Sequence, residues 1–341
     1  MKKSFIRLAA VAAVAALTLT SCHNQEAPVE EAVNDTVEVY MTREISPESL
    51  IRIYEAVNHQ APADAKVAVK ISTGEMGGHN YLKPELIGQF VSKVNGTIVE
   101  CNTAYAGKRN TTEAHWETIK AHGFLDIAKC DIMDEEGEFE IPVSDTTRIK
   151  CDIVGSHMAN YDYMVNLAHF KGHQMGGFGG VLKNASIGVA SSNGKAYIHT
   201  AGATKLASEL WAKLPADWDK TPEGNDPFTE SMAAAAQAVH NYFAAKKGIV
   251  YIDVMNNMSI DCDCSSNPAE PLIKDYGILG STDPVALDQA CLDIISQMTV
   301  TDDNNSQPLK ERIAQRNGQH IVEYAEKIGL GTRVYKIICI D

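Results

Sequence analysis

Residues 66–101 have the sequence KVAVKISTGEMGGHNYLKPELIGQFVSKVNGTIVEC, and this stretch decides the fold class. Its first part, Lys66–Ser72, is rich in Val and Ile and predicts a buried strand. Pro84–Val94 predicts a helix, and Gly96–Cys101 predicts a second apolar strand. Two strands joined by a helix of ten or more residues pair in parallel, so this stretch indicates an α/β fold.

The same alternation continues toward the C-terminus. Ser46 before Pro47 and Asp283 before Pro284 are typical of a helix N-cap followed by proline at the first helical position. Further strands are expected at Cys151–Val154, Met164–Leu167 and Ile249–Val254, and helices at 47–57, 112–122, 228–245, 284–297 and 319–327.

This pattern predicts one layered α/β domain over residues 43–341, with a mostly parallel sheet and helices on both faces. We expect two lobes, at 43–160 and 161–341, with a cleft between them. Such a cleft is the usual place for a small-molecule ligand.

The N-terminus has the features of a lipoprotein signal peptide over residues 1–21. Basic residues precede an apolar run at Leu8–Leu19, which is too short to span a membrane, and small residues lead into Cys22. We therefore expect cleavage before Cys22 and lipidation of its thiol, so that a lipid anchor holds the protein on a bacterial membrane in the cell envelope. Residues 22–42 are charged and rich in helix breakers and predict a flexible tether.

Composition excludes one class of partner. The chain has 341 residues, with 30 Lys and Arg against 44 Asp and Glu, for a net charge of −14. No basic run interrupts this acidic balance to form a phosphate-binding stripe, so we expect no nucleic-acid partner. The expected partners are the membrane and a small molecule.

Chemically active side chains are densest between His169 and His199. Glycines in this segment let the backbone approach a ligand or another chain segment closely, since no Cβ obstructs it. Histidines can be metal ligands or proton shuttles near neutral pH, and a desolvated lysine can carry a covalent adduct. The candidates for metal binding or catalysis here are His169, His173, Lys183 and His199. The candidates for cofactor binding are Gly177, Gly179, Gly180, Lys183 and Asn184.

Cys262 and Cys264 form a second candidate site. One intervening residue puts both side chains on the same side of an extended chain. Two thiolates so placed are typical ligands of zinc, iron or copper. A purely structural or exposed pair is the alternative.

Three segments resemble the domain of unknown function 362 family. They are HFKGHQMGGFGGVLKNASIGVASSNGKAYIH at 169–199, the segment 251–293 with its CDC and DYGILGSTDPVALDQA runs, and EYAEKIGLGTRVYKI near the C-terminus. Many members carry a ferredoxin-like insert with two four-cysteine runs and an iron–sulfur role. Residues 201–245 here contain no cysteine, so this chain lacks those ligands.

The spacing of His173, Lys183 and His199 is also similar to that of the nickel-pincer lactate racemases. That resemblance implies that His173 is a base, that Lys183 binds a pyridinium-derived cofactor covalently, and that His199 ligates nickel. The racemases have a second histidine base in a Gly-x-His-Arg segment. Lys108 stands at that place here, so two-base racemisation is in doubt unless Lys108 serves as the base.

Two functional hypotheses follow from these residues. The first is a metal-dependent enzyme of the cell envelope that transfers a proton or hydride on a small polar substrate, with nickel, zinc or iron as the suspected cofactor. The second is a non-catalytic metal or iron–sulfur binding protein that uses Cys262 and Cys264.

Overall fold

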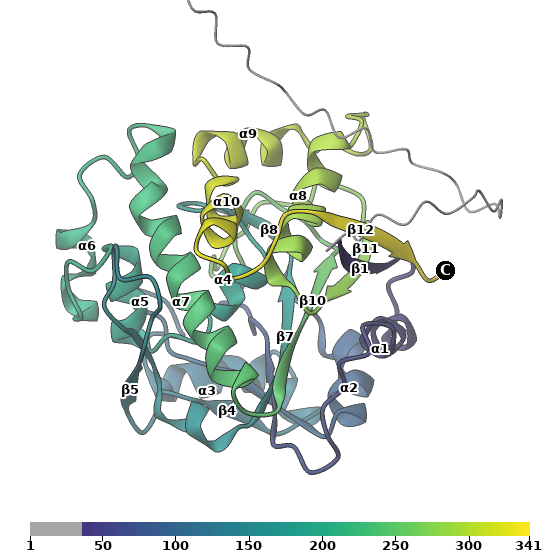
Figure 1. Cartoon of the computed structure of the whole chain (residues 1–341), viewed down its shortest axis with the longest axis horizontal. Coiled ribbons are helices and arrows are strands. Elements are labelled where there is room, and N and C mark those ends of the chain that lie inside the picture. Colours follow the sequence, from purple (N-terminus) through teal and green to yellow (C-terminus); the bar gives the residue numbers. More distant parts are fainter. Residues whose placement is uncertain (1–35) are drawn as a thin grey trace, which may run out of the picture. The chain divides into compact units, whose positions relative to one another are not determined.

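The computed structural model describes residues 36–341, which form one compact unit around a central sheet (Figure 1). The predicted signal peptide and Cys22 lie outside the described residues. Among residues 36–341, no helix has both the length and the apolar character needed to cross a membrane.

Within the described residues, the central sheet has eight strands, and seven of them run in the same direction. Only β11 is antiparallel to its neighbours. In spatial order the strands are β12 (Tyr335–Cys339), β1 (Val37–Thr42), β11 (Gly277–Ser281), β10 (Gly248–Met255), β7 (Tyr163–His169), β2 (Val67–Lys70), β3 (Gly96–Glu100) and β4 (Cys130–Ile132). The predicted mostly parallel α/β fold is confirmed.

Alternate residues of the central strands pack into two separate hydrophobic clusters. On β7, Val165 and Leu167 face one cluster, while Met164 and Ala168 face the other. This alternation follows from the two-residue period of a strand, and near-continuous apolar character is what a strand covered on both faces requires.

Helices cover both faces of the sheet, as predicted. One face carries α1 (Pro47–Ala56), α2 (Pro84–Lys93) and α3 (Thr112–Ala121). The other carries α4 (Val181–Ala185), α5 (Ser192–His199), α7 (Asp226–Ala244), α8 (Pro284–Gln297) and α10 (His320–Lys327). Figure 1 shows α7 to the left of β7 and β10, with α1 and α2 to their right.

The predicted caps form as expected. The Ser46 hydroxyl accepts a hydrogen bond from the Ser49 amide at 3.1 Å, and Asp283 accepts two from the first turn of α8. These bonds satisfy amides that a helix start leaves without partners.

The remaining elements are short and lie mostly outside the central sheet. Two small antiparallel pairs join β5 (Glu138–Ile141) to β6 (Asp152–Gly155) and β8 (Lys171–His173) to β9 (Gly177–Gly179). Helices α6 (Leu210–Lys213) and α9 (Gln307–Gln315) complete the fold.

Two predicted boundaries differ from the structure. The tether was expected to extend to Thr42, but Val37–Thr42 is strand β1, which hydrogen-bonds between β11 and β12. The expected lobe boundary at 160/161 does not divide the sheet, because β7 pairs with β2 on one side and with β10 on the other. Backbone pairing therefore joins the two expected lobes.

The direction of the chain reverses between β2 and β7. From β2 the chain proceeds outward through β3 to β4, whereas from β7 it proceeds the other way to β10. Right-handed crossovers in opposite directions place their helices on opposite faces, so the loops diverge at this point. The carboxyl ends of strands at such a switch point are where α/β proteins bind ligands.

Truncation of Leu167 tests how much the central strand contributes to stability. Leu167→Ala deletes a side chain that is fully buried on β7, and we expect the free energy of unfolding to fall by about 2–5 kcal/mol. Leu125, which is 44% exposed, provides the matched control, because Leu125→Ala is expected to change stability by less than about 0.5 kcal/mol. Equal losses in urea unfolding would contradict this assignment of the core.

Candidate functional site

Two adjoining clefts lie at the carboxyl edge of the sheet. We call the first the basic cleft, because its lining includes Lys70, Arg109, Lys171, Lys183 and Lys195. We call the second the apolar cleft, because its lining includes Leu210, Trp211, Leu214 and Trp218. Tyr105, Cys262 and Cys264 line both clefts and therefore mark the boundary between them.

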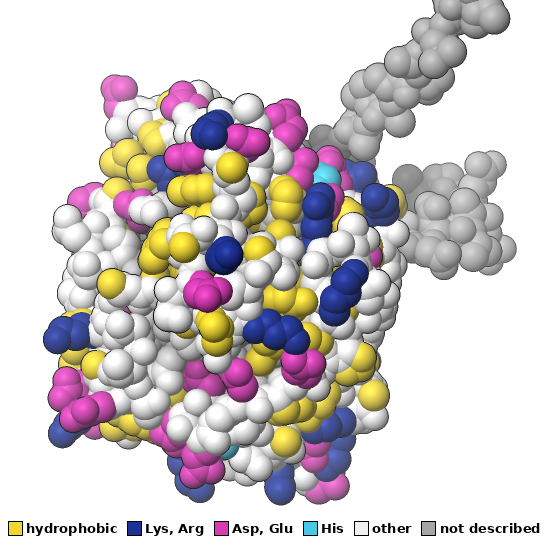
Figure 2. Space-filling view, turned by 90° about the vertical axis from the view of Figure 1, so that its left-hand side faces the viewer, with side chains coloured by type: hydrophobic (Ala, Val, Ile, Leu, Met, Phe, Trp, Pro, Cys, Tyr) yellow, Lys and Arg dark blue, Asp and Glu magenta, His cyan; other side chains and the backbone are white. Residues whose placement is uncertain are grey.

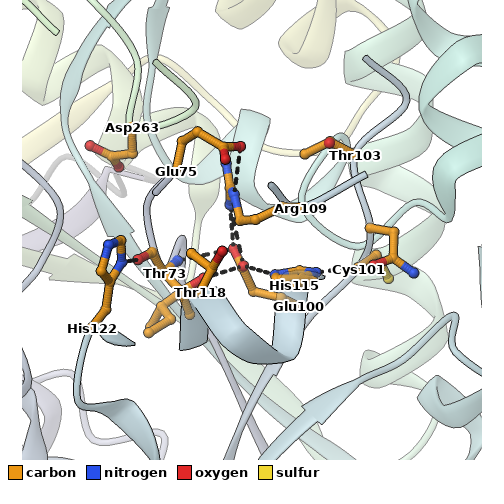
Figure 3. A network of polar contacts seen from close by, with 12 residues as sticks. Thr73, Glu75, Glu100, Cys101, Thr103, Arg109, His115, Thr118, His122 and Asp263 are labelled. Atoms are coloured by element: carbon orange, nitrogen blue, oxygen red, sulfur yellow. Dashed lines mark hydrogen bonds and ion pairs between the residues drawn. The ribbon is translucent and has the colours of Figure 1, made fainter. Parts of the chain in front are cut away.

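A buried carboxylate, Glu100, organises the floor of the basic cleft (Figure 3). Its oxygens accept hydrogen bonds from the Thr73 hydroxyl at 2.6 Å, from Arg109 Nη1 at 3.3 Å and from His115 Nε2 at 2.9 Å. Burial alone would raise the pKa of Glu100, but Arg109, His115 and Lys70 outweigh it and hold the pKa well below its usual range. Glu100 is therefore a stable anion that ties the loop after β2 to the loop after β3.

A second carboxylate, Glu75, holds the other side of Arg109. Arg109 Nε lies 3.5 Å from Glu75 Oε2, and Figure 3 shows the guanidinium between the two carboxylates. The Lys108 amide donates to Glu75 Oε1 at 2.5 Å. The Lys108 side chain is exposed and does not line either cleft, so the structure places Arg109 at the site and Lys108 outside it.

Cys262, Cys264 and Lys183 meet where the two clefts join. Lys183 Nζ lies 3.3 Å from Cys262 Sγ, although the two residues are 79 positions apart in the chain. A hydrogen bond from Cys264, together with Lys183 and Lys171, lowers the pKa of Cys262 well below its usual range. The same hydrogen bond raises the pKa of Cys264. The pair therefore holds one thiolate and one thiol.

His173 completes a group of soft ligands with these cysteines. One ligand atom from each of His173, Cys262 and Cys264 lies within 4.8 Å of the others. Sulfur and imidazole nitrogen are the donors that zinc and other transition metals prefer. The sequence predicts Cys262 and Cys264 as metal ligands and His173 as a base, and the structure brings these three side chains together.

The two histidines of the apolar cleft have opposite tautomers. Burial lowers the pKa of His173 well below its usual range and that of His199 to about 4, so both rings are neutral. His173 Nδ1 accepts from the Gly176 amide at 2.8 Å, so its hydrogen is on Nε2. His199 Nδ1 donates to the Lys195 carbonyl at 2.6 Å, so its Nε2 has the lone pair.

His169 has a different place from the one expected. Its Nδ1 lies 2.9 Å from Asp263 Oδ1 and its Nε2 lies 2.6 Å from the Asn256 carbonyl, so both ring nitrogens face acceptors. A ring bound in this way offers no lone pair to a metal. Together with Lys171, which lies 3.0 Å from the other Asp263 oxygen, His169 anchors the loop that carries the two cysteines.

Helix α4, which carries Lys183, starts against a carboxylate from another helix. Asp288 of α8 accepts from the Val181 and Leu182 amides at 2.8 and 3.0 Å. A Cβ at Gly180 would lie 2.3 Å from Asp288 Oδ1 and 2.9 Å from Asp253 Oδ2, so only glycine leaves room for this cap. The lack of a side chain at Gly180 therefore lets Asp288 cap α4, and this cap holds the helix that carries Lys183.

The other expected cofactor-binding residues mostly contact protein. Gly177 has a φ of +81° and packs against the backbone of Ile313 and Gly318. A Cβ at Gly179 would lie 3.1 Å from Lys183 Cδ. The Asn184 amide donates to the Lys70 carbonyl at 2.9 Å and to Asn166 Oδ1 at 2.7 Å, although Asn184 also lines the basic cleft.

Sequence reasoning missed the charged floor of the basic cleft. Lys70 and Glu100 each end an otherwise apolar strand, and this contrast is the signal that could have found them. Lys195 and Arg109 gave no such signal, because they come from a helix and a loop whose approach to the cleft depends on tertiary packing.

These observations define an α/β protein with a buried group of thiol and imidazole ligands beside several lysines. The chain belongs to the domain of unknown function DUF362 family, whose sequence profile matches residues 67–293. The predicted resemblance to this family is confirmed. No curated protein sequence matches the chain significantly.

Two solved structures are similar to this chain. One is the lactate racemase apoprotein from Thermoanaerobacterium thermosaccharolyticum, with 14% identity and a TM-score of 0.42 over 76% of this chain and 58% of that chain. The other is a structural-genomics protein from Thermotoga maritima, with 10% identity and a TM-score of 0.39 over 83% of this chain and 59% of that chain. The chain thus spans less than two thirds of either protein, and its function is inferred from the clefts themselves.

The buried Lys70 ammonium gives the protein a measurable pH dependence. Burial lowers the pKa of Lys70 from 10.5 to about 8 in the folded protein. Between pH 8 and 10.5 the unfolded chain binds more protons at this lysine, so the contribution of Lys70 to stability rises with pH, by up to ~3 kcal/mol.

Urea unfolding at several pH values measures this contribution. The free energy of unfolding of the wild type, minus that of Lys70→Met, is expected to rise from pH 8 to pH 10.5. Lys120, which is exposed on α3, supplies the control, and Lys120→Met is expected to show no such trend. A flat difference for Lys70→Met would show that the ammonium keeps its ordinary pKa.

Proposed function

We propose that this protein is a metal-dependent enzyme that transfers a proton on a small-molecule substrate. The observation that carries the proposal is the group formed by His173, Cys262 and Cys264, with Lys183 Nζ 3.3 Å from Cys262 Sγ. The two clefts bring together three features that such an enzyme needs, which are ligands for a soft ion, groups able to transfer a proton, and space for a substrate.

The donor set fits a single transition-metal ion. Two sulfurs and one imidazole nitrogen suit zinc, nickel or iron, and three donors leave a coordination position for substrate. A bound ion would have to displace the hydrogen from His173 Nε2, because the Gly176 amide donates to Nδ1. An iron–sulfur cluster is usually held by four ligands, so the same donors fit a cluster less well. A bound ion would supply Lewis-acid polarisation of a substrate oxygen.

The remaining side chains suit proton transfer. His199, with the lone pair on Nε2, can accept a proton from a substrate, while the ring of His173 belongs to the proposed ion site. Both rings line the apolar cleft and flank Phe228, with ring centroids 6.2 and 4.8 Å from its own. Lys183 stabilises negative charge at the boundary of the clefts.

Metal content is the first test of this proposal. Elemental analysis by mass spectrometry of protein purified without affinity metals is expected to find about one zinc, nickel or iron per chain. Cys262→Ser and Cys264→Ser are expected to lower the content at least tenfold, because each removes a thiolate ligand. Cys130 lies on β4, away from both clefts, so Cys130→Ser is the matched control and is expected to retain the metal.

The Lys183→Ala variant distinguishes the proposed metal-dependent enzyme from a protein that binds metal without catalysis. An enzyme of the proposed kind loses turnover in this variant while it keeps most of its metal. A non-catalytic binding protein depends on Cys262 and Cys264 alone. Metal content unchanged in both cysteine variants would refute the proposed ion site.

We also propose that a lipid on Cys22 holds the protein in the cell envelope. The support is the apolar run before Cys22 and the small residues that lead into it. Cys22→Ser is expected to move the protein from the membrane fraction to the soluble fraction and to remove the mass of the lipid. Retention of Cys22→Ser in the membrane fraction would contradict lipid anchoring.

A further inference from the structure

We propose that the two clefts together bind an organic acid, with its carboxylate in the basic cleft and an apolar or aromatic body in the apolar cleft. This inference deepens the proposed function by naming the class of substrate. It rests on the charge balance of one cleft, the lining of the other and the boundary they share.

The cationic side chains of the basic cleft outnumber the carboxylates that could balance their charge. Glu100 and Glu75 are engaged by Arg109, and Asp263 is engaged by Lys171. Among residues 36–341, the Lys195 ammonium contacts only carbonyl oxygens, those of Ala190 at 2.6 Å and Cys101 at 3.4 Å.

Two more lysines use up the remaining negative charge. Lys183 is paired with the Cys262 thiolate, and Lys70 lies 3.8 Å from a Glu100 oxygen that Arg109 already contacts, so Lys195 is left without an anionic partner among these groups. A buried cation without a counter-ion is costly, so the cleft favours an anionic group from a ligand.

The basic cleft is small, with a volume of about 50 Å³, whereas the apolar cleft has about 290 Å³. A volume of this size holds only a few water molecules, so it suits a compact charged group such as a carboxylate. The body of a larger acid has to lie in the apolar cleft.

Aromatic and aliphatic side chains line the apolar cleft from α6 and the loop after it. Trp211 is 66% exposed and, together with Leu210, Leu214 and Trp218, forms one wall. Figure 2 shows the side of the molecule on which α6 lies in Figure 1, where hydrophobic side chains gather in patches with Lys and Arg between them. An exposed tryptophan beside a cleft is a surface on which an apolar or aromatic group stacks.

The boundary makes the two clefts one continuous site. Because Cys262 and Cys264 line both, an acid that spans the boundary places the atoms next to its carboxylate beside the proposed metal ligands. The side chains of His173 and His199 then face the body of the same molecule.

A chain-length series tests this inference by calorimetric titration of the full mature protein. The probes are acetate, butanoate, hexanoate and octanoate. The dissociation constant is expected to fall about fourfold for each methylene buried. Hexylammonium and octylammonium, which have the same apolar bodies and the opposite charge, are expected not to bind.

Matched variants separate the two clefts. Trp218→Ala and Leu214→Ala are expected to flatten the dependence on chain length, while Trp116→Ala, whose indole bonds to Glu135 outside the clefts, leaves it unchanged. Lys195→Gln is expected to weaken octanoate binding at least tenfold, whereas the exposed Lys120→Gln has no effect. If Lys195→Gln does not fold, the wild-type series and its ammonium controls still decide the question.

Three results would overturn the inference. They are a dissociation constant that does not change with chain length, equal binding of the ammonium ions, and tighter binding of hexyl phosphate than of hexanoate. Metal analysis of the same samples keeps the proposed function separate. If the protein contains metal but its affinity for the acids does not depend on chain length, only the proposed substrate class is overturned. If the affinity depends on chain length but the protein contains no metal, only the proposal of a metal-dependent enzyme is overturned.

Discussion

The structure of the site depends on a buried carboxylate, Glu100, at the end of β3. A fully buried anion is tolerated only when its oxygens are paired, and Thr73, Arg109 and His115 supply those bonds. Since Thr73 follows β2 and Arg109 follows β3, one side chain fixes two loops at the carboxyl edge of the sheet. The cationic lining of the basic cleft is built around this anion.

Asp263 has a role like that of Glu100 on the other side of the switch point between β2 and β7. Its carboxylate contacts His169, the last residue of β7, and Lys171, two residues further on, and its neighbours in sequence are the two cysteines. The burial of Asp263 would raise its pKa, but His169 and Lys171 lower it instead. The loop that presents Cys262 and Cys264 is thus held by an ion-pair network rather than by a disulfide or a helix.

Elements with a strong local signal were predicted well. The apolar strands near Val69, Val165 and Ile252 and the capped helices at Pro47 and Pro284 form nearly as expected, because each depends on local periodicity and capping. Strand β1 at Val37–Thr42 was missed because its sequence is half polar, and its pairing partners, β11 and β12, are more than 200 residues away.

The sequence by itself determined the α/β class, the family and the residues able to do chemistry: His173, Lys183, His199, Cys262 and Cys264. Their types and spacing are local properties. Only the tertiary structure decided that Lys183 meets Cys262 and that His169 pairs with Asp263. It also decided which cationic side chains line the basic cleft: Lys108 does not, whereas Lys70, Arg109 and Lys195 do. These contacts join loops from different strands, and the order in which strands pair is set by packing of the whole sheet.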